Sequence, residues 1–157
     1  MEKMYPILLI IHSFIRWFIF WGVVTVTFKS WYGWLGNKPF TQFDQRLGEA
    51  VTRFAQIQFL IGLGLYFLSP LVDYFLHHFS EAIHIRQARF FGMEHITMMT
   101  LAVGFISRGS QAPKRRESDQ KKFRVMAISF AIALIIILVN IPWPFSPFAS
   151  RPFFRWF

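Results

Sequence analysis

Apolar positions dominate four long stretches of the chain, and short polar segments separate these stretches. The apolar stretches cover roughly residues 7–28, 54–76, 90–107 and 125–143. Each is close to the about 20 residues that a helix needs to cross the hydrocarbon core of a bilayer. The connecting segments 29–53, 77–89 and 108–124 are too short to form separate soluble domains. The pattern therefore predicts an all-α, four-helix transmembrane bundle over residues 1–143.

Prolines interrupt the helical pattern after the fourth stretch. Pro142, Pro144 and Pro147 stand close together, so this segment cannot continue as a regular helix. The tail of residues 144–157 is rich in aromatic side chains and contains Arg151 and Arg155. One interpretation is that the tail lies along a partner subunit, with both arginines facing lipid headgroups or partner acids. The other is an aromatic belt that rests on lipid.

The composition strengthens the membrane interpretation. The hydrophobic set makes up 54% of the chain and charged residues only 16%, which is too few to cover a soluble globular surface. This balance excludes a soluble enzyme, a disordered protein and a nucleic-acid-binding module. The absence of cysteine excludes disulfides, iron–sulfur clusters and haem attached through Cys. Any cofactor must be held by His, carboxylate, amide, Met or backbone groups.

The distribution of Lys and Arg predicts an orientation. The connections 29–53 and 108–124 together carry 11 basic residues, whereas the opposite side carries 5. Because basic loops stay in the cytoplasm, both termini are expected on the outer, periplasmic side of a bacterial inner membrane. The basic loop 108–124 can also contact anionic lipid. A topology signal without any partner explains the same loop.

Polar residues inside the spans are the candidates for chemistry, because burying them in lipid is expensive. His12 and Arg16 are four residues apart on one face of the first helix, and Glu94 and His95 stand in the third. At 1.5 Å per residue, His12 and His95 both lie roughly 8–10 Å from the outer edge. Two imidazoles at one depth on neighbouring helices are what a haem b with two axial His ligands requires.

Several neighbouring residues fit the same interpretation. Gly62 and Gly64 in the second span allow a flat ring or another helix to approach closely. Arg16 can pair with Glu94 or with an acidic group of a cofactor. The alternative is purely structural: the two His hydrogen-bond neighbouring helices, the glycines serve packing, and Arg16 and Glu94 form a buried ion pair.

Two weaker signals remain. Gln56 and Gln58 can line a polar crevice or a quinone headgroup site, but hydrogen bonds between helices are the favoured interpretation. His77, Glu81 and His84 share one face if their segment is helical and could then bind a metal; an interfacial amphipathic segment is favoured instead. No nucleophile–base set, phosphate-binding loop or HExxH motif is present, so we expect no catalytic activity of its own.

Several motifs resemble a family of small four-span membrane proteins of Bacteroidetes-type bacteria, commonly labelled cytochrome B. The resemblance covers nearly the whole chain to Trp143 and is carried by residues 5–13, the loop 36–40, residues 58–70, the pair Glu94-His95 and the ending 141–143. It implies His12 and His95 as axial ligands of a haem. The family also carries a His at the start of the second span, where this sequence has Gln56. This departure removes one ligand and argues against a second haem.

The expectation is therefore a small b-type-cytochrome-like subunit for electron transport, which works beside a larger membrane complex and holds one haem b near the outer face. The alternative is a haem-free accessory subunit that packs against such a complex through its aromatic surface. A transporter or quinone-site protein, which would rest on Arg16, Glu94 and Gln56, is the third interpretation.

Overall fold

The computed structural model describes residues 4–152, and within that range the chain forms helices and their connections without any strand. Four helical segments are long and apolar enough to cross a membrane: Met4–Leu35, Gln42–Leu68, Arg86–Arg115 and Asp119–Asn140. The predictions of an all-helical fold and of four spans are confirmed, and the chain is a multi-pass membrane protein. The predicted tail residues 153–157, including Arg155, lie outside the described residues.

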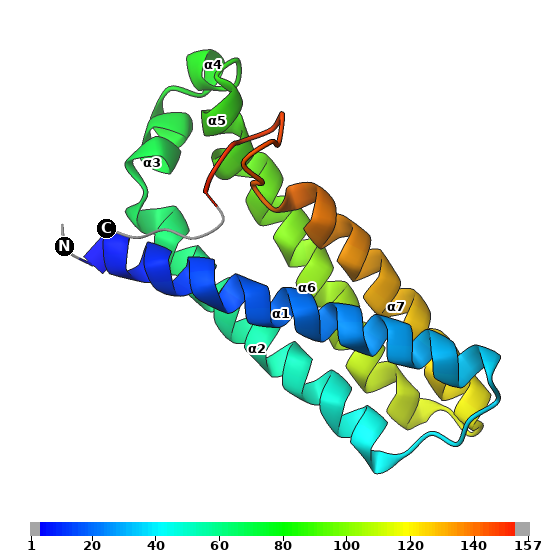
Figure 1. Ribbon diagram of the computed structural model, residues 1–157. Coiled ribbons are helices and arrows are strands. Elements are labelled where there is room, and N and C mark those ends of the chain that lie inside the picture. Colours follow the sequence, from blue (N-terminus) through cyan, green and yellow to red (C-terminus); the bar gives the residue numbers. More distant parts are fainter. Residues whose placement is uncertain (1–3, 153–157) are drawn as a thin grey trace.

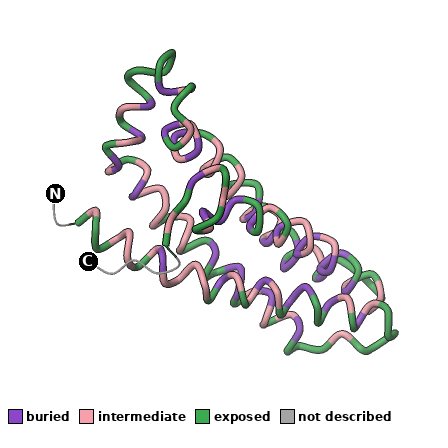
Figure 2. The backbone as a smooth tube through the Cα atoms, turned by 45° about the horizontal axis from the view of Figure 1, so that its top comes forward, coloured by how far each residue is buried: buried purple, intermediate pink, exposed green. Residues whose placement is uncertain are grey.

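Four long helices form the bundle: α1 (Met4–Leu35), α2 (Gln42–Leu68), α6 (His95–Gln111) and α7 (Asp119–Asn140). Helix α1 packs against α2 and α7, and α6 packs against the same two helices, so the four surround one core (Figure 1). Figure 2 shows buried positions along the inward faces of these helices. The core contains Val23, Val26, Ile106, Met126 and Phe130.

The α1–α2 and α6–α7 connections lie together at one end of the bundle, which we call the closed end (Figure 1). Here aromatic rings fill the spaces above glycines. A Cβ placed on Gly33 would lie 2.4 Å from Cζ of Phe123, and one on Gly109 would lie 2.6 Å from Cδ2 of Phe130. Only glycine permits such close approach, so α7 packs tightly against both α1 and α6.

Local capping explains why α2 begins at Gln42. Asn37 takes a left-handed conformation with φ of 50°, and the Lys38 amide donates to the Gly33 carbonyl at 3.0 Å, which ends α1. Thr41 and Asp44 then form a reciprocal capping box. Asp44 also pairs with Lys29 at 3.1 Å. Helix α2 then continues without interruption from Gln42 into the second span.

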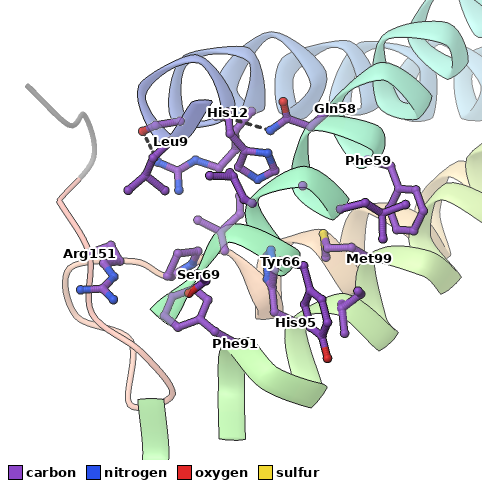
Figure 3. Close-up of a pocket in the computed structure, with 18 of the residues that line it drawn as sticks. Leu9, His12, Gln58, Phe59, Tyr66, Ser69, Phe91, His95, Met99 and Arg151 are labelled. Carbon is purple, nitrogen blue, oxygen red and sulfur yellow. Dashed lines mark hydrogen bonds between the residues drawn. The ribbon is translucent and has the colours of Figure 1, made fainter. Parts of the chain in front are cut away.

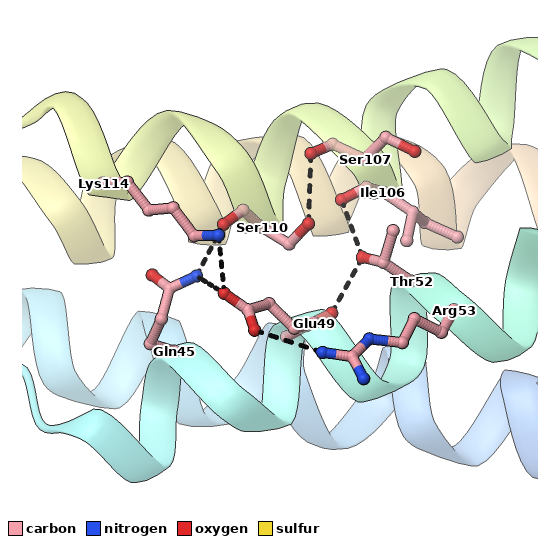
Figure 4. A network of polar contacts seen from close by, with 9 residues as sticks. Gln45, Glu49, Thr52, Arg53, Ile106, Ser107, Ser110 and Lys114 are labelled. Carbon is pink, nitrogen blue, oxygen red and sulfur yellow. Dashed lines mark hydrogen bonds and ion pairs between the residues drawn. The ribbon is translucent and has the colours of Figure 1, made fainter.

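A polar network links α2 to the end of α6 at the closed end (Figure 4). The Glu49 carboxylate contacts Lys114 at 2.8 Å and Arg53 at 3.6 Å. Gln45 donates to Glu49 and to the carbonyl of Ser110, each at 2.8 Å. These groups satisfy one another and join α2 to the end of α6 and the connection that follows it.

The opposite end of the bundle, the cavity end, contains a helical excursion. Helix α2 ends at Leu68, and Ser69 then caps α3 (Pro70–His77), which is followed by α4 (Phe79–Ala82) and α5 (Arg86–Arg89). The second span therefore ends at Leu68 and not at the predicted residue 76, because Ser69 is extended and Pro70 begins a new helix. The excursion has a small core of its own, Phe75, Ala82 and Ala88.

A π-helix joins this excursion to α6. The π-helical turn η1 spans Phe90–Glu94, between α5 and α6. Gly92 lies under the ring of Phe75, where a Cβ would approach to 2.4 Å. The Tyr66 hydroxyl donates to the Gly92 carbonyl at 2.9 Å. π-Helical turns are rare and occur frequently at functional sites.

Residues after α7 fold back onto the excursion. The Arg86 guanidinium lies 4.6 Å from the centre of the Phe148 ring and donates to the Pro147 carbonyl at 3.4 Å. Ala149 is buried, and the Ser150 hydroxyl donates to the Pro144 carbonyl at 2.7 Å. The described part of the tail, 144–152, therefore packs on its own chain.

Candidate functional site

A cavity of about 420 Å³ lies at the cavity end. Helices α1 and α2 diverge there from α6 and α7 (Figure 1), and the excursion and the tail complete the wall. Its volume falls within the range of about 300–1,000 Å³ that is usual for small-molecule and cofactor sites. Its lining is mainly apolar, with polar side chains from His12, Ser13, Arg16, Gln58, Tyr66, Ser69, His95 and Arg151.

Helix α1 supplies one wall of the cavity. Tyr5, Leu9, His12, Arg16 and Ile19 all line it. Their spacing of three or four residues places them on a single stripe of the helix. The sequence therefore directs His12 and Arg16 into the same space, and not toward lipid.

Two residues of α2 hold His12 in place. The Gln58 side chain donates from Nε2 to the His12 carbonyl at 2.7 Å. One helical turn further, Gly62 leaves room for the imidazole: a Cβ there would lie 3.2 Å from Cε1 of His12. The Nδ1 atom of His12 and the Oε1 atom of Gln58 are buried and find no hydrogen-bond partner within residues 4–152. The site therefore contains buried polar atoms that a bound polar group can satisfy.

His95 enters the same cavity from α6 (Figure 3). It is the first residue after the π-helical turn, and this turn sets the direction around the helix axis in which the His95 side chain points. Its Nδ1 atom lies 3.2 Å from the Asn140 carbonyl. Because a carbonyl oxygen only accepts, Nδ1 carries the hydrogen in this contact and Nε2 keeps its lone pair. Metal-bound histidines usually donate their second ring N–H in this way.

Two cations also line the cavity. The Arg16 guanidinium lies 5.3 Å from the Trp17 ring centre, and one of its nitrogens is 3.5 Å from Oγ of Ser13. Arg151 lies 5.1 Å from the ring centre of Phe91. The sequence predicts Arg151 toward headgroups or partner acids, whereas the structure places it on the cavity wall (Figure 3). No acidic side chain is among the described residues of the wall.

The structure brings together only part of the predicted set. His12, Arg16, Gly62 and His95 line the cavity, whereas Gly64 packs near Leu8 and does not line it. Glu94 is also outside the wall; its carboxylate forms an ion pair with Arg89 at 2.8 Å.

Of the residues behind the weaker predictions, Gln58 lines the cavity, whereas Gln56 and the segment 77–84 lie outside it. Gln56 is exposed and reaches Ser107 on α6 at 3.4 Å, which confirms the interpretation as a hydrogen bond between helices. The segment that contains His77, Glu81 and His84 is not one helix, because α3 ends at His77 and α4 begins at Phe79. Across residues 4–152, no group of three or more His, Cys, Asp or Glu side chains is close enough to hold a metal ion.

Several wall residues have little signal in the sequence. Phe59, Phe91 and Met99 look like ordinary lipid-facing or packing residues, yet they line the cavity. Ser69 does so because the chain turns there, and the adjacent Ser-Pro pair is the one local signal for that turn.

Comparison of the chain with models of protein families, with curated proteins and with solved structures finds no match in any of the three. The fold and the site by themselves define the chain as a four-span membrane protein with a histidine-lined cavity. The resemblance to cytochrome B-labelled proteins stays a prediction.

Proposed function

We propose that the protein is a small b-type-cytochrome-like electron-transfer subunit, which holds one haem b between His12 and His95. The observation that carries this proposal is the meeting of two histidines from different helices in one apolar cavity. No other described residue pair in the spans offers two imidazoles to one space, since the remaining three histidines lie in residues 77–84.

The residues fit this group chemically. His95 keeps its Nε2 lone pair for iron because Nδ1 donates to Asn140. The apolar wall suits a porphyrin face, and Gly62 leaves space beside the His12 ring. Arg16 and Arg151 line the cavity, and their positive charge would suit the carboxylates of a haem. Bound haem would supply reversible one-electron chemistry of its iron.

The orientation predicted from the basic residues also gives the position of the haem in the membrane. With the basic connections in the cytoplasm of a bacterial inner membrane, the cavity end faces the outer side, and the haem lies close to that surface. A buried one-electron carrier needs a donor and an acceptor, so we propose that the subunit works beside a larger redox complex.

A spectrum of the mildly solubilised protein tests this proposal. We expect a reduced-minus-oxidised b-type band in the wild-type protein and its loss in His12→Ala and His95→Ala. Matched controls are His77→Ala and His84→Ala, which remove exposed imidazoles outside the cavity. These controls should keep the full band.

A rescue experiment separates ligation from packing. The variants His12→Gly and His95→Gly leave a space that added imidazole can fill, so imidazole should restore the band if the side chain is an iron ligand. Bands that persist in all four alanine variants would contradict the assignment. A wild-type protein that remains haem-free after addition of haemin would favour the haem-free accessory subunit.

A further inference from the structure

A second hollow, of about 330 Å³, lies at the closed end and is unrelated to the histidine cavity. Its lining consists of four basic and two apolar residues: Arg108, Arg116, Lys121, Arg124, Val125 and Ile128. We infer that this hollow binds the phosphate headgroup of an anionic phospholipid, with one acyl chain directed along Val125 and Ile128.

Of the seven basic residues in the segment 108–124, two pair with acids, four line the hollow, and Arg115 does neither. Lys114 pairs with Glu49 at 2.8 Å and Lys122 with Asp119 at 3.0 Å, so acids of the chain already neutralise these two. The four basic residues of the hollow are exposed, and within residues 4–152 none of them forms an ion pair. Arg124 has a cation–π contact with Trp34, 5.6 Å from its ring centre, which leaves its charge uncompensated.

Acidic side chains near the hollow do not offset this charge. Asp119 is engaged by Lys122, and Glu49 by Lys114. Glu117 is exposed and makes no ion pair within the described chain. A general topology signal requires only that basic residues be present in the loop. It does not require that four of them converge on one hollow.

The order of residues along α7 matches a lipid molecule. Lys121, Arg124, Val125 and Ile128 follow one another at helical spacing on one face, and the charged pair comes first. Lys121 and Ile128 are seven residues apart, about 10 Å along the helix axis. This is similar to the depth over which a bilayer leaflet changes from headgroup to hydrocarbon, about 5–8 Å on each side. A free phosphate would use the four cations but not the apolar end.

Arg108 and Arg116 close the hollow from the other side. Arg108 belongs to the last turn of α6, and Arg116 follows the short 3₁₀ helix η2 (Ala112–Arg115). Pro113 is fully buried and anchors this connection. The four cations therefore come from two helices and the segment that joins them, which fixes their separation better than a flexible tail does.

Adjacent residues provide a matched test. Arg116 lines the hollow, whereas Arg115 is exposed and does not. In native mass spectrometry with added phosphatidylglycerol, the double variant Arg116→Gln/Lys121→Gln should bind this lipid about 30-fold more weakly, since each of the two basic residues near an anionic surface contributes roughly 1 kcal/mol. The control Arg115→Gln/Arg46→Gln removes the same charge elsewhere and should bind like the wild type. Phosphatidylcholine should show no such difference.

Each remaining outcome counts against the inference. An equal loss in the control variant would mean that total charge, and not this hollow, attracts the lipid. Displacement of phosphatidylglycerol by inorganic phosphate at similar concentration would identify the ligand as a free phosphate. Because all four exchanged side chains are exposed, the fold should survive; where Arg116→Gln/Lys121→Gln melts early, the single variants Arg116→Gln and Arg115→Gln provide the same contrast.

Discussion

The two ends of the bundle are built from the same four helices, yet they differ in packing. At the closed end, phenylalanine rings occupy the space above Gly33 and Gly109, and a polar network joins α2 to α6. At the cavity end, the helix pairs diverge around about 420 Å³ of open space. The partly buried His12 and His95 line that space, whereas the closed end pairs Lys29 with Asp44 and Lys114 with Glu49.

This difference shows how a helical bundle can combine stability with a site. Small residues opposite large rings bring helices together, and in a bilayer such packing replaces the hydrophobic driving force of water. The cavity end instead uses a helix break at Ser69, a π-helical turn before His95 and an excursion that separates the helix pairs. Equal substitutions should therefore have unequal effects at the two ends.

The largest contrast is expected for phenylalanine truncation. Phe130 is fully buried and its ring lies over Gly109, so Phe130→Ala should lower the free energy of unfolding by about 3 kcal/mol. Phe59 lines the existing cavity, and Phe59→Ala should have a much smaller effect. Reversible unfolding in mixed detergent measures both. Equal losses would show that the cavity end is as tightly packed as the closed end.

Enlargement of a buried alanine should give the second contrast between the two ends. Ala127 is fully buried and lies away from the cavity, so Ala127→Leu should destabilise by about 1–3 kcal/mol through overpacking. Ala102 is also buried but lines the cavity, which can accept the larger side chain of Ala102→Leu. We expect near wild-type stability for Ala102→Leu and weaker haem binding. If Ala127→Leu were more stable than Ala102→Leu, the cavity beside Ala102 could not be open.

The smallest contrast concerns the helix caps. Thr41→Ala removes a reciprocal capping box at the start of a long span, so the unfolding free energy should fall by about 0.5–2 kcal/mol. Ser69→Ala removes the cap of the eight-residue helix α3, where we expect faster local hydrogen exchange and little change in global stability. Hydrogen exchange read by mass spectrometry, together with thermal unfolding, distinguishes the two. Global destabilisation by Ser69→Ala would mean that the excursion folds as one unit with the bundle.

Much of the fold could be predicted from the lengths of the apolar stretches alone. Four stretches near 20 residues can satisfy their backbone in lipid only as helices, and the structure has four such helices. Hydropathy predicts a second span that ends too late, because apolar residues continue to Leu76. The Ser69-Pro70 pair ends α2 through local backbone geometry, which hydropathy does not register.

The site was predictable in part. Counting residues from the span edges placed His12 and His95 at one depth, and the helical repeat placed Arg16 on the face of His12. The π-helical turn adds one residue to a turn, which changes the side-chain rotation that a regular repeat predicts for His95. Arg151 reaches the wall only because the tail folds back, and no local pattern encodes that contact.

The central claim is that His12 and His95 bind one metal centre between them. Electron paramagnetic resonance of the oxidised, haemin-loaded protein tests it most directly, because ligation by two imidazoles gives low-spin ferric haem. We predict one low-spin haem per chain in the wild type and in His84→Ala. We predict high-spin or absent haem in both His12→Ala and His95→Ala. A low-spin signal that survives either of these two substitutions, or a wild-type protein that takes up no haem, would contradict the account.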